Sequence, residues 1–96
     1  MAEYRLRPRA QRDLDGIFDY TVAQWCLSQA LRYTDLIENA CADLAKAPQR
    51  GQSCANIRPG YRRCSVEQHV IYFRPTRYGI AIVRILHQRM DATRNL

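Results

Sequence analysis

The stretch Tyr78-Gly79-Ile80-Ala81-Ile82-Val83-Arg84-Ile85-Leu86-His87 decides the fold, because it is the longest apolar and β-branched run in the chain. With a period of two, both of its sides are mostly apolar, which is typical of a central strand. We therefore predict that earlier strands flank it. Its two polar exceptions, Arg84 and His87, are the first candidates for function. In strict alternation one side would carry Ile80, Ile82, Arg84 and Leu86, and the other Ala81, Val83, Ile85 and His87.

Two helical patterns precede this strand. Residues 3–7 alternate and predict a short first strand. Apolar side chains then recur at intervals of three and four over residues 8–24 and again over 28–44, with Ser28 as a plausible N-cap of the second helix. Because only residues 25–27 separate the two patterns, we predict a tight antiparallel helical hairpin.

Strand patterns occupy most of the remaining chain. A short edge strand is expected within 53–58, a β-hairpin over 61–66 and 69–74, and a turn at 74–77 before the last strand. If the helical hairpin returns the chain to the end of the sheet where the first strand finished, the last strand runs parallel to the first and pairs with it. The sequence thus predicts one α+β domain over residues 1–96, with strand order 1-5-4-3-2 and both helices on one face.

The net charge of +6 is unevenly distributed. Residues 1–56 hold seven basic and seven acidic side chains, whereas residues 57–96 hold eight arginines against Glu67 and Asp91. Arginine supplies all cations except Lys46, which favours bidentate contacts with carboxylate or phosphate groups. Genomic base composition explains this ratio equally well, but it does not explain the uneven placement.

The sequence lacks the residues that several classes of function require. The four cysteines have no paired chelate spacing, so neither a zinc site nor a disulfide framework is indicated. A phosphate-binding glycine loop, a serine nucleophile motif and clustered carboxylates are also missing. No apolar run approaches the roughly 20 residues of a membrane helix. We expect a reduced cytoplasmic protein with no metal, no cofactor and no membrane segment.

An apolar contact surface is the first candidate site. Two helices cover only one face of a sheet whose central strand is apolar on both, so apolar surface should remain for an amphipathic helix or an added strand from a partner. The apolar residues of the helices are also the simplest core candidates. The residues considered for this contact are Leu14, Ile17, Phe18, Trp25, Tyr33, Ile37 and Leu44.

A basic surface is the second candidate site. Seven arginines from the second half of the chain could form a basic face suited to a phosphate backbone or to an acidic protein. Scattered solvated cations are the plain alternative, and strand alternation separates Arg62 from Arg63. Because an aromatic platform for single strands is missing, a protein partner that already holds DNA is expected rather than direct sequence-specific recognition of nucleic acid. The arginines are Arg58, Arg62, Arg63, Arg74, Arg77, Arg84 and Arg89.

A set of motifs extends over nearly the whole chain in order. They include Tyr4-Arg5-Leu6, Asp13-Leu14, Gly60-Tyr61-Arg62-Arg63, His69-Val70-Ile71-Tyr72-Phe73-Arg74 and, most specifically, Arg84-Ile85-Leu86-His87-Gln88-Arg89-Met90-Asp91. This set resembles the ParE toxins of type II toxin–antitoxin systems, a branch of the RelE/ParE superfamily. One departure is Cys26, where relatives commonly have glycine after the tryptophan.

The resemblance implies an intracellular bacterial toxin that inhibits DNA gyrase by binding and stalls it on cleaved DNA. It also implies a ParD-like antitoxin, encoded beside the toxin, as the natural occupant of the apolar contact surface. The residues expected to contact gyrase are Arg58, Arg62, Arg63, Arg74, Arg84, His87 and Arg89.

Two other functions stay open. Related ribosome-dependent mRNA endonucleases use similar residue types, so Arg84, His87 and Arg89 could form a catalytic set, and an imidazole titrates near neutrality. Only Asp91 lies near His87 in sequence as an orienting carboxylate, so a structural or partner-contacting histidine is the simpler interpretation and no catalytic residue is assigned. A non-toxic basic adaptor is the other alternative.

Overall fold

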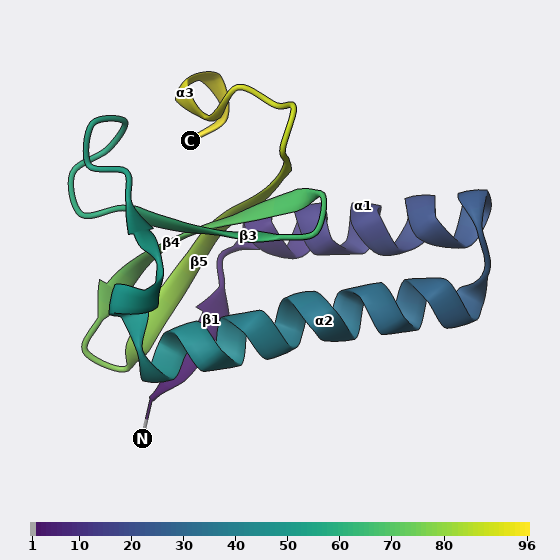
Figure 1. The fold of residues 1–96 in the computed structure, drawn as a ribbon, viewed down its shortest axis with the longest axis horizontal. Helices are drawn as coiled ribbons and strands as arrows, with labels where there is room; N and C mark the ends of the chain where they lie inside the picture. Colours follow the sequence, from purple (N-terminus) through teal and green to yellow (C-terminus); the bar gives the residue numbers. More distant parts are fainter. Residues whose placement is uncertain (1) are drawn as a thin grey trace.

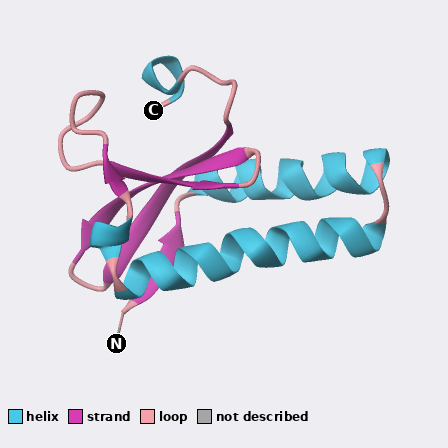
Figure 2. Cartoon of the chain, in the orientation of Figure 1, coloured by secondary structure: helices cyan, strands magenta, loops and turns pink. Residues whose placement is uncertain are grey.

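The computed structural model describes residues 2–96 as a helical hairpin laid against a five-stranded sheet (Figures 1 and 2). The α+β class is confirmed. In these residues no helix has the length and apolar content needed to cross a membrane. The elements are β1 (Glu3–Leu6), α1 (Pro8–Gln24), α2 (Leu27–Lys46), the 3-10 turn η1 (Pro48–Arg50), β2 (Gln52–Ser53), β3 (Arg62–Val66), β4 (His69–Thr76), β5 (Gly79–His87) and α3 (Ala92–Asn95).

The sheet has the predicted order β1-β5-β4-β3-β2. β1 pairs with β5 in parallel, and the other pairs are antiparallel. The last strand is therefore central, and α1 and α2 run side by side as the expected hairpin (Figure 1). The short β1 pairs only with residues 79–82, so the second half of β5 has an edge that β1 does not cover.

The main core lies between the helical hairpin and the sheet. α1 contributes Ala10, Leu14 and Ile17, and α2 contributes Ile37, Cys41 and Leu44, at the helical spacing seen in the sequence. They pack against strand residues such as Phe73 and Ile82, whose side chains are fully buried. Burial of a side chain of this size stabilises a fold by roughly 1.5–3 kcal/mol, so this layer holds the hairpin in place.

A β-bulge in β5 changes which residues share a face. Tyr72 pairs with Arg84, but Phe73 pairs with Ile82, so Val83 is the extra residue. Strict alternation is therefore wrong beyond Val83. Ile80 and Ile82 before the bulge and Ile85 after it belong to the main core, whereas Leu86 joins a separate cluster.

The other face of the sheet is partly covered, which corrects the expectation that it stays open. Tyr72 and Leu86 are buried there together with Cys54 of the loop that follows β2, and this loop and α3 cover them. The partly buried apolar residues of this second cluster are Ile57, Tyr61, Val70, Ala92 and Leu96.

Some predicted boundaries were wrong. Cys26, with extended backbone, is the residue before α2, and Ser28 lies inside its first turn with its Oγ 3.2 Å from Cys26 Sγ. The edge strand covers only Gln52–Ser53, because the chain turns at Cys54, whose carbonyl accepts the N–H of Ile57. β4 continues to Thr76, two residues beyond the predicted end of that strand, and β5 begins at Gly79.

Candidate functional site

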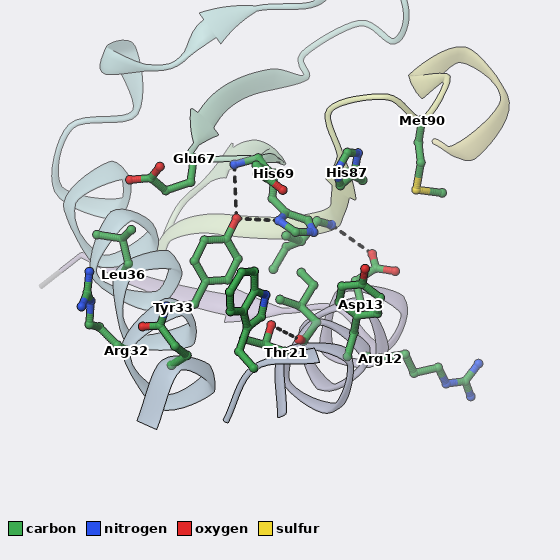
Figure 3. Close-up of a pocket in the computed structure, with 17 residues that line it drawn as sticks. Arg12, Asp13, Thr21, Arg32, Tyr33, Leu36, Glu67, His69, His87 and Met90 are labelled. Carbon is green, nitrogen blue, oxygen red and sulfur yellow. Dashed lines mark hydrogen bonds between the residues drawn. The ribbon is translucent and has the colours of Figure 1, made fainter. Parts of the chain in front are cut away.

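An open groove of about 920 Å³ lies between the helical hairpin and the end of β5 (Figure 3). α1 and α2 form its helical walls, and the β3–β4 turn, β5 and the following loop close its other side. Its lining combines residues from positions 12 to 90, so only the tertiary fold creates it.

Four of the seven large apolar side chains that are exposed within residues 2–96 line the groove. Tyr20 and Trp25 are 65% and 73% exposed, and Leu36 and Met90 are also exposed. Large apolar side chains clustered at a hollow, unlike single surface residues, mark a site for a partner or ligand. Ile17 and Ile85, both buried, complete the apolar lining, so an occupant would contact the edge of the core.

A polar cluster lies in the same groove (Figure 3). The Tyr33 hydroxyl is 2.7 Å from His69 Nδ1 and accepts the backbone N–H of Gln68 at 3.3 Å. The ring of His69 also meets the ring of His87 edge to face, with centroids 5.4 Å apart. This arrangement places aromatic and polar groups together between β4, β5 and α2.

The cluster favours neutral side chains. Burial lowers the pKa of His69, and the neighbouring His87 lowers it further. Burial likewise raises the pKa of Tyr33. Since a weaker base and a weaker acid are poor proton-transfer groups at neutral pH, these shifts do not favour general acid–base catalysis. In addition, no carboxylate of residues 2–96 bonds to either imidazole ring.

His87 is held by the loop that follows it. Its Nδ1 accepts the backbone N–H of Arg89 at 3.1 Å, which leaves Nε2 to carry the proton of the neutral ring. The bulge at Val83 places His87 beside His69 on the helical side of the sheet. A sequence argument based on strict alternation could not have placed it with the core residues Ile80 and Ile82.

Arg84 lies apart from this groove. Its guanidinium donates to both carboxylate oxygens of Asp13, from Nε at 2.7 Å and from Nη2 at 2.9 Å, and Nη1 donates to the carbonyl of Asn95. Only 9% of the residue is exposed. The bond to Asp13 raises the pKa of Arg84, so the cation is permanent. Its prediction as a gyrase contact is corrected, because these bonds leave almost no surface for a partner.

The other residues expected to contact gyrase do not form one face. Arg58 and Arg74 line a second, separate cleft, whereas His87 lies in the groove. Arg63 is exposed on β3, and Arg89 is exposed in the loop after β5. Arg62 is half-buried and its guanidinium donates to the carbonyls of Pro48, Gln49 and Gly51, so it mainly holds the 3-10 turn against β3.

The apolar set predicted for the antitoxin divides into three groups. Leu14, Ile37 and Leu44 are buried in the main core and cannot touch a partner, which corrects their assignment. Phe18 is half-buried, and it is not part of the groove lining. The residues of the predicted set that do line the groove are Ile17, Trp25 and Tyr33.

Sequence reasoning missed several groove residues. Leu36 widens the apolar stripe of α2, which was a usable signal, whereas Tyr20 lies off the stripe of α1. Met90 and His69 come from a loop and a strand whose packing the sequence does not reveal. Arg12 and Arg32, two exposed arginines at the groove, lie in the half of the chain whose charges balance, so no signal in the sequence pointed to them.

Comparison with known proteins identifies the family. A family model described as "ParE toxin of type II toxin-antitoxin system, parDE" matches residues 4–92. The chain belongs to the ParE toxin family. It is thus the ParE toxin component of a ParDE toxin–antitoxin system, as the motifs in the sequence indicated.

Named relatives match nearly the whole chain. Toxin ParE1 of Mycobacterium tuberculosis is 43% identical over 96 residues, 99% of this chain and 98% of that protein. Toxin ParE1 of Caulobacter vibrioides is 38% identical over 96 residues, with 100% and 99% covered. Toxin ParE of Escherichia coli is 34% identical over 92 residues, with 95% and 89% covered.

A solved structure shares the fold. A chain of the "Chromosomal ParDE TA system from P. aeruginosa" matches with a TM-score of 0.77 and 26% identity, covering 91% of this chain and 96% of that one. The arrangement of hairpin and sheet is therefore that of a ParDE component.

Proposed function

We propose that this ParE toxin inhibits DNA gyrase by binding, promotes stalled complexes on cleaved DNA, and is neutralised by a ParD-like antitoxin that fills the groove. The observation that carries the proposal is the exposed apolar groove centred on Trp25, which is 73% exposed beside a well-packed core. The ParDE structure with the same fold supports an antitoxin as its occupant. The four cysteines are free thiols, which agrees with a cytoplasmic setting.

The groove suits an amphipathic helix. Such a helix would bury apolar anchors at i, i+3, i+4 and i+7 against Trp25, Leu36 and Met90. Arg12 and Arg32 line the same groove, and within the described chain neither forms an ion pair. Acidic residues beside the apolar stripe of the antitoxin would therefore be favoured, and they would set its orientation more than its affinity.

Neutralisation would follow from the position of the groove. His87 lines it, and Arg89 lies in the loop directly beyond. A helix in the groove would cover His87 and hinder access to that loop. The residues that remain proposed gyrase contacts are Arg58, Arg62, Arg63, Arg74, His87 and Arg89.

The deciding experiment is a supercoiling assay with antitoxin-free toxin, scored for lost supercoiling and for accumulated cleaved DNA, beside a translation extract probed for mRNA cleavage. Lost supercoiling with cleaved DNA and intact mRNA is the expected result. Cut mRNA with unaffected gyrase would overturn the proposal. The variant His87→Ala sharpens the comparison, because graded loss is expected for a binding contact and collapse for a catalytic group.

The geometry does not favour the endonuclease alternative. Arg84 is engaged by Asp13 and Asn95, while His87 lies in the groove beside His69. The three residues Arg84, His87 and Arg89 therefore do not converge on one exposed point. The adaptor alternative is answered by the same assay, since an adaptor would leave both gyrase and mRNA unaffected.

A further inference from the structure

A second cleft, of about 530 Å³, is built mainly from arginine side chains. Half of the residues that line it are arginines, and no acidic side chain of residues 2–96 is among them. The arginines come from four separate parts of the chain, so the fold collects them. The lining residues are Arg7, Pro8, Arg9, Arg58, Tyr61, Arg74, Val83, Arg84, Asn95 and Leu96.

The start of α1 lies at this cleft and is electrostatically unfavourable as it stands. The N-terminus of a helix carries a partial positive charge and prefers acidic residues, yet Arg7 is the N-cap residue and Arg9 lies in the first turn. No acidic residue occupies this turn, and no side chain caps it. A bound anion would interact favourably with both arginines and with the helix N-terminus, and so would offset this repulsion.

The hydrogen bonds around the cleft leave most of its donors free. Arg58 donates to the oxygen of Leu96, the last residue described, at 2.9 Å, and Arg84 donates to the backbone carbonyl of Asn95 at 2.8 Å. The Asn95 carbonyl is a neutral acceptor, and an anionic oxygen in its place would bind more strongly. Within residues 2–96, Arg7, Arg9 and Arg74 have no side-chain hydrogen bond. Asp13 neutralises the charge of Arg84 and of no other arginine at the cleft.

We propose that this cleft binds successive phosphodiester groups of a nucleic-acid strand through the backbone, without reading the bases. Three guanidinium groups at the cleft, those of Arg7, Arg9 and Arg74, have no hydrogen-bond partner within residues 2–96, and a phosphodiester chain supplies an anion at every nucleotide to pair with them. An acidic peptide is the less suitable ligand, because half of the lining is arginine and the apolar residues of the cleft are few, namely Pro8, Tyr61, Val83 and Leu96. The apolar anchors that a peptide would use are in the groove on the hairpin.

The proposal concerns this chain and nucleic acid alone, so it does not rest on gyrase inhibition. The test is fluorescence anisotropy of a labelled oligonucleotide of about 12 nucleotides, in single- and double-stranded form, titrated with the full chain at several salt concentrations. Removing one phosphate contact should weaken binding roughly three- to tenfold at low salt and reduce the salt slope by roughly 0.7–0.9. We expect this result for Arg9→Ala and for Arg74→Ala.

The matched control is Arg77→Ala, which removes an exposed arginine from the β4–β5 turn, outside the cleft. It should leave the affinity within about twofold of the parent, because a diffuse charge contributes little at one position. An equal loss in this variant would overturn the proposal in favour of general surface charge. The proposal would also be overturned if the cleft bound poly-glutamate but not the oligonucleotide, or if it bound neither. Gyrase inhibition that persists in such a case would leave the proposed function intact.

Discussion

The carboxylate of Asp13 accepts hydrogen bonds from Nε and Nη2 of Arg84, at 2.7 and 2.9 Å, and from the backbone N–H of Ile85 at 3.0 Å. It does so at the part of β5 that lies beyond the end of β1. A side chain of α1 thus bonds to β5 at the edge that β1 is too short to cover. Because Arg84 also holds the carbonyl of Asn95, the pair connects α1, β5 and α3.

Replacement of Asp13 by Asn should destabilise the fold by about 3 kcal/mol, since it leaves the buried Arg84 cation without its counter-ion. The measurement is urea unfolding followed by circular dichroism. The double variant Asp13→Leu with Arg84→Met should lose less than Asp13→Asn, because it removes both buried charges together. A loss below about 0.5 kcal/mol for Asp13→Asn would mean that the pair acts as an exposed one.

Replacement of Trp25 by Ala should separate binding from stability. The side chain is 73% exposed, so the free energy of unfolding should change by less than about 0.5 kcal/mol. Affinity for the ParD-like antitoxin should fall at least about 30-fold, as expected for an aromatic anchor worth 2 kcal/mol or more.

Isothermal titration calorimetry with the antitoxin encoded beside the toxin provides the measurement for Trp25. Leu31→Ala is the control, because Leu31 is 51% exposed on α2 but does not line the groove. Equal losses for the two variants would locate the antitoxin elsewhere on the hairpin.

The stability of the fold should depend on His69 below neutral pH. Burial and His87 lower the pKa of His69 from its usual 6.5, so the unfolded chain binds its proton more readily than the folded chain. This contribution is fully present above pH 6.5 and declines as the pH falls toward the lowered pKa. Urea unfolding at pH 7.5 and 5.5 should therefore show a smaller loss of stability on acidification for His69→Gln than for the parent. An identical loss in the two proteins would show that His69 titrates freely in the fold.

Two glycines should respond to alanine in opposite directions. A Cβ at Gly79 would collide with the backbone of Glu3 in β1, and its φ of +141° is one that other residues rarely adopt. Gly79→Ala should therefore cost more than about 2 kcal/mol. Gly16 lies inside α1 with open space around its Cα, so Gly16→Ala should add roughly 0.5–1 kcal/mol through helix propensity. Thermal melts of both variants test this pair, and a stabilising Gly79→Ala would mean that β1 is not held as described.

Groove residues could be found from the sequence only where they continue a periodic pattern. Tyr33 lies within the apolar spacing of the second helical pattern, and Trp25 lies directly after the first; both were in the apolar set considered for a partner contact. His69 lies 36 positions from Tyr33, yet the two side chains are 2.7 Å apart, a contact that no local spacing encodes. The arginines at 7 and 9 were counted as balanced charge in the first half of the chain, and only the fold places them beside Arg58 and Arg74.

The sequence by itself determined the elements, the strand order and the family, because hydrophobic periodicity and motif order are local properties that burial enforces along each helix and strand. Only the tertiary structure decided how the polar residues of the last strand are used. The bulge at Val83 shifts the alternation by one residue, which places His87 with the helices, and the end of β1 leaves an edge that Asp13 and Arg84 complete. The bulge and the Asp13–Arg84 bond both depend on pairing between distant segments, so neither can be predicted from neighbouring residues in the sequence.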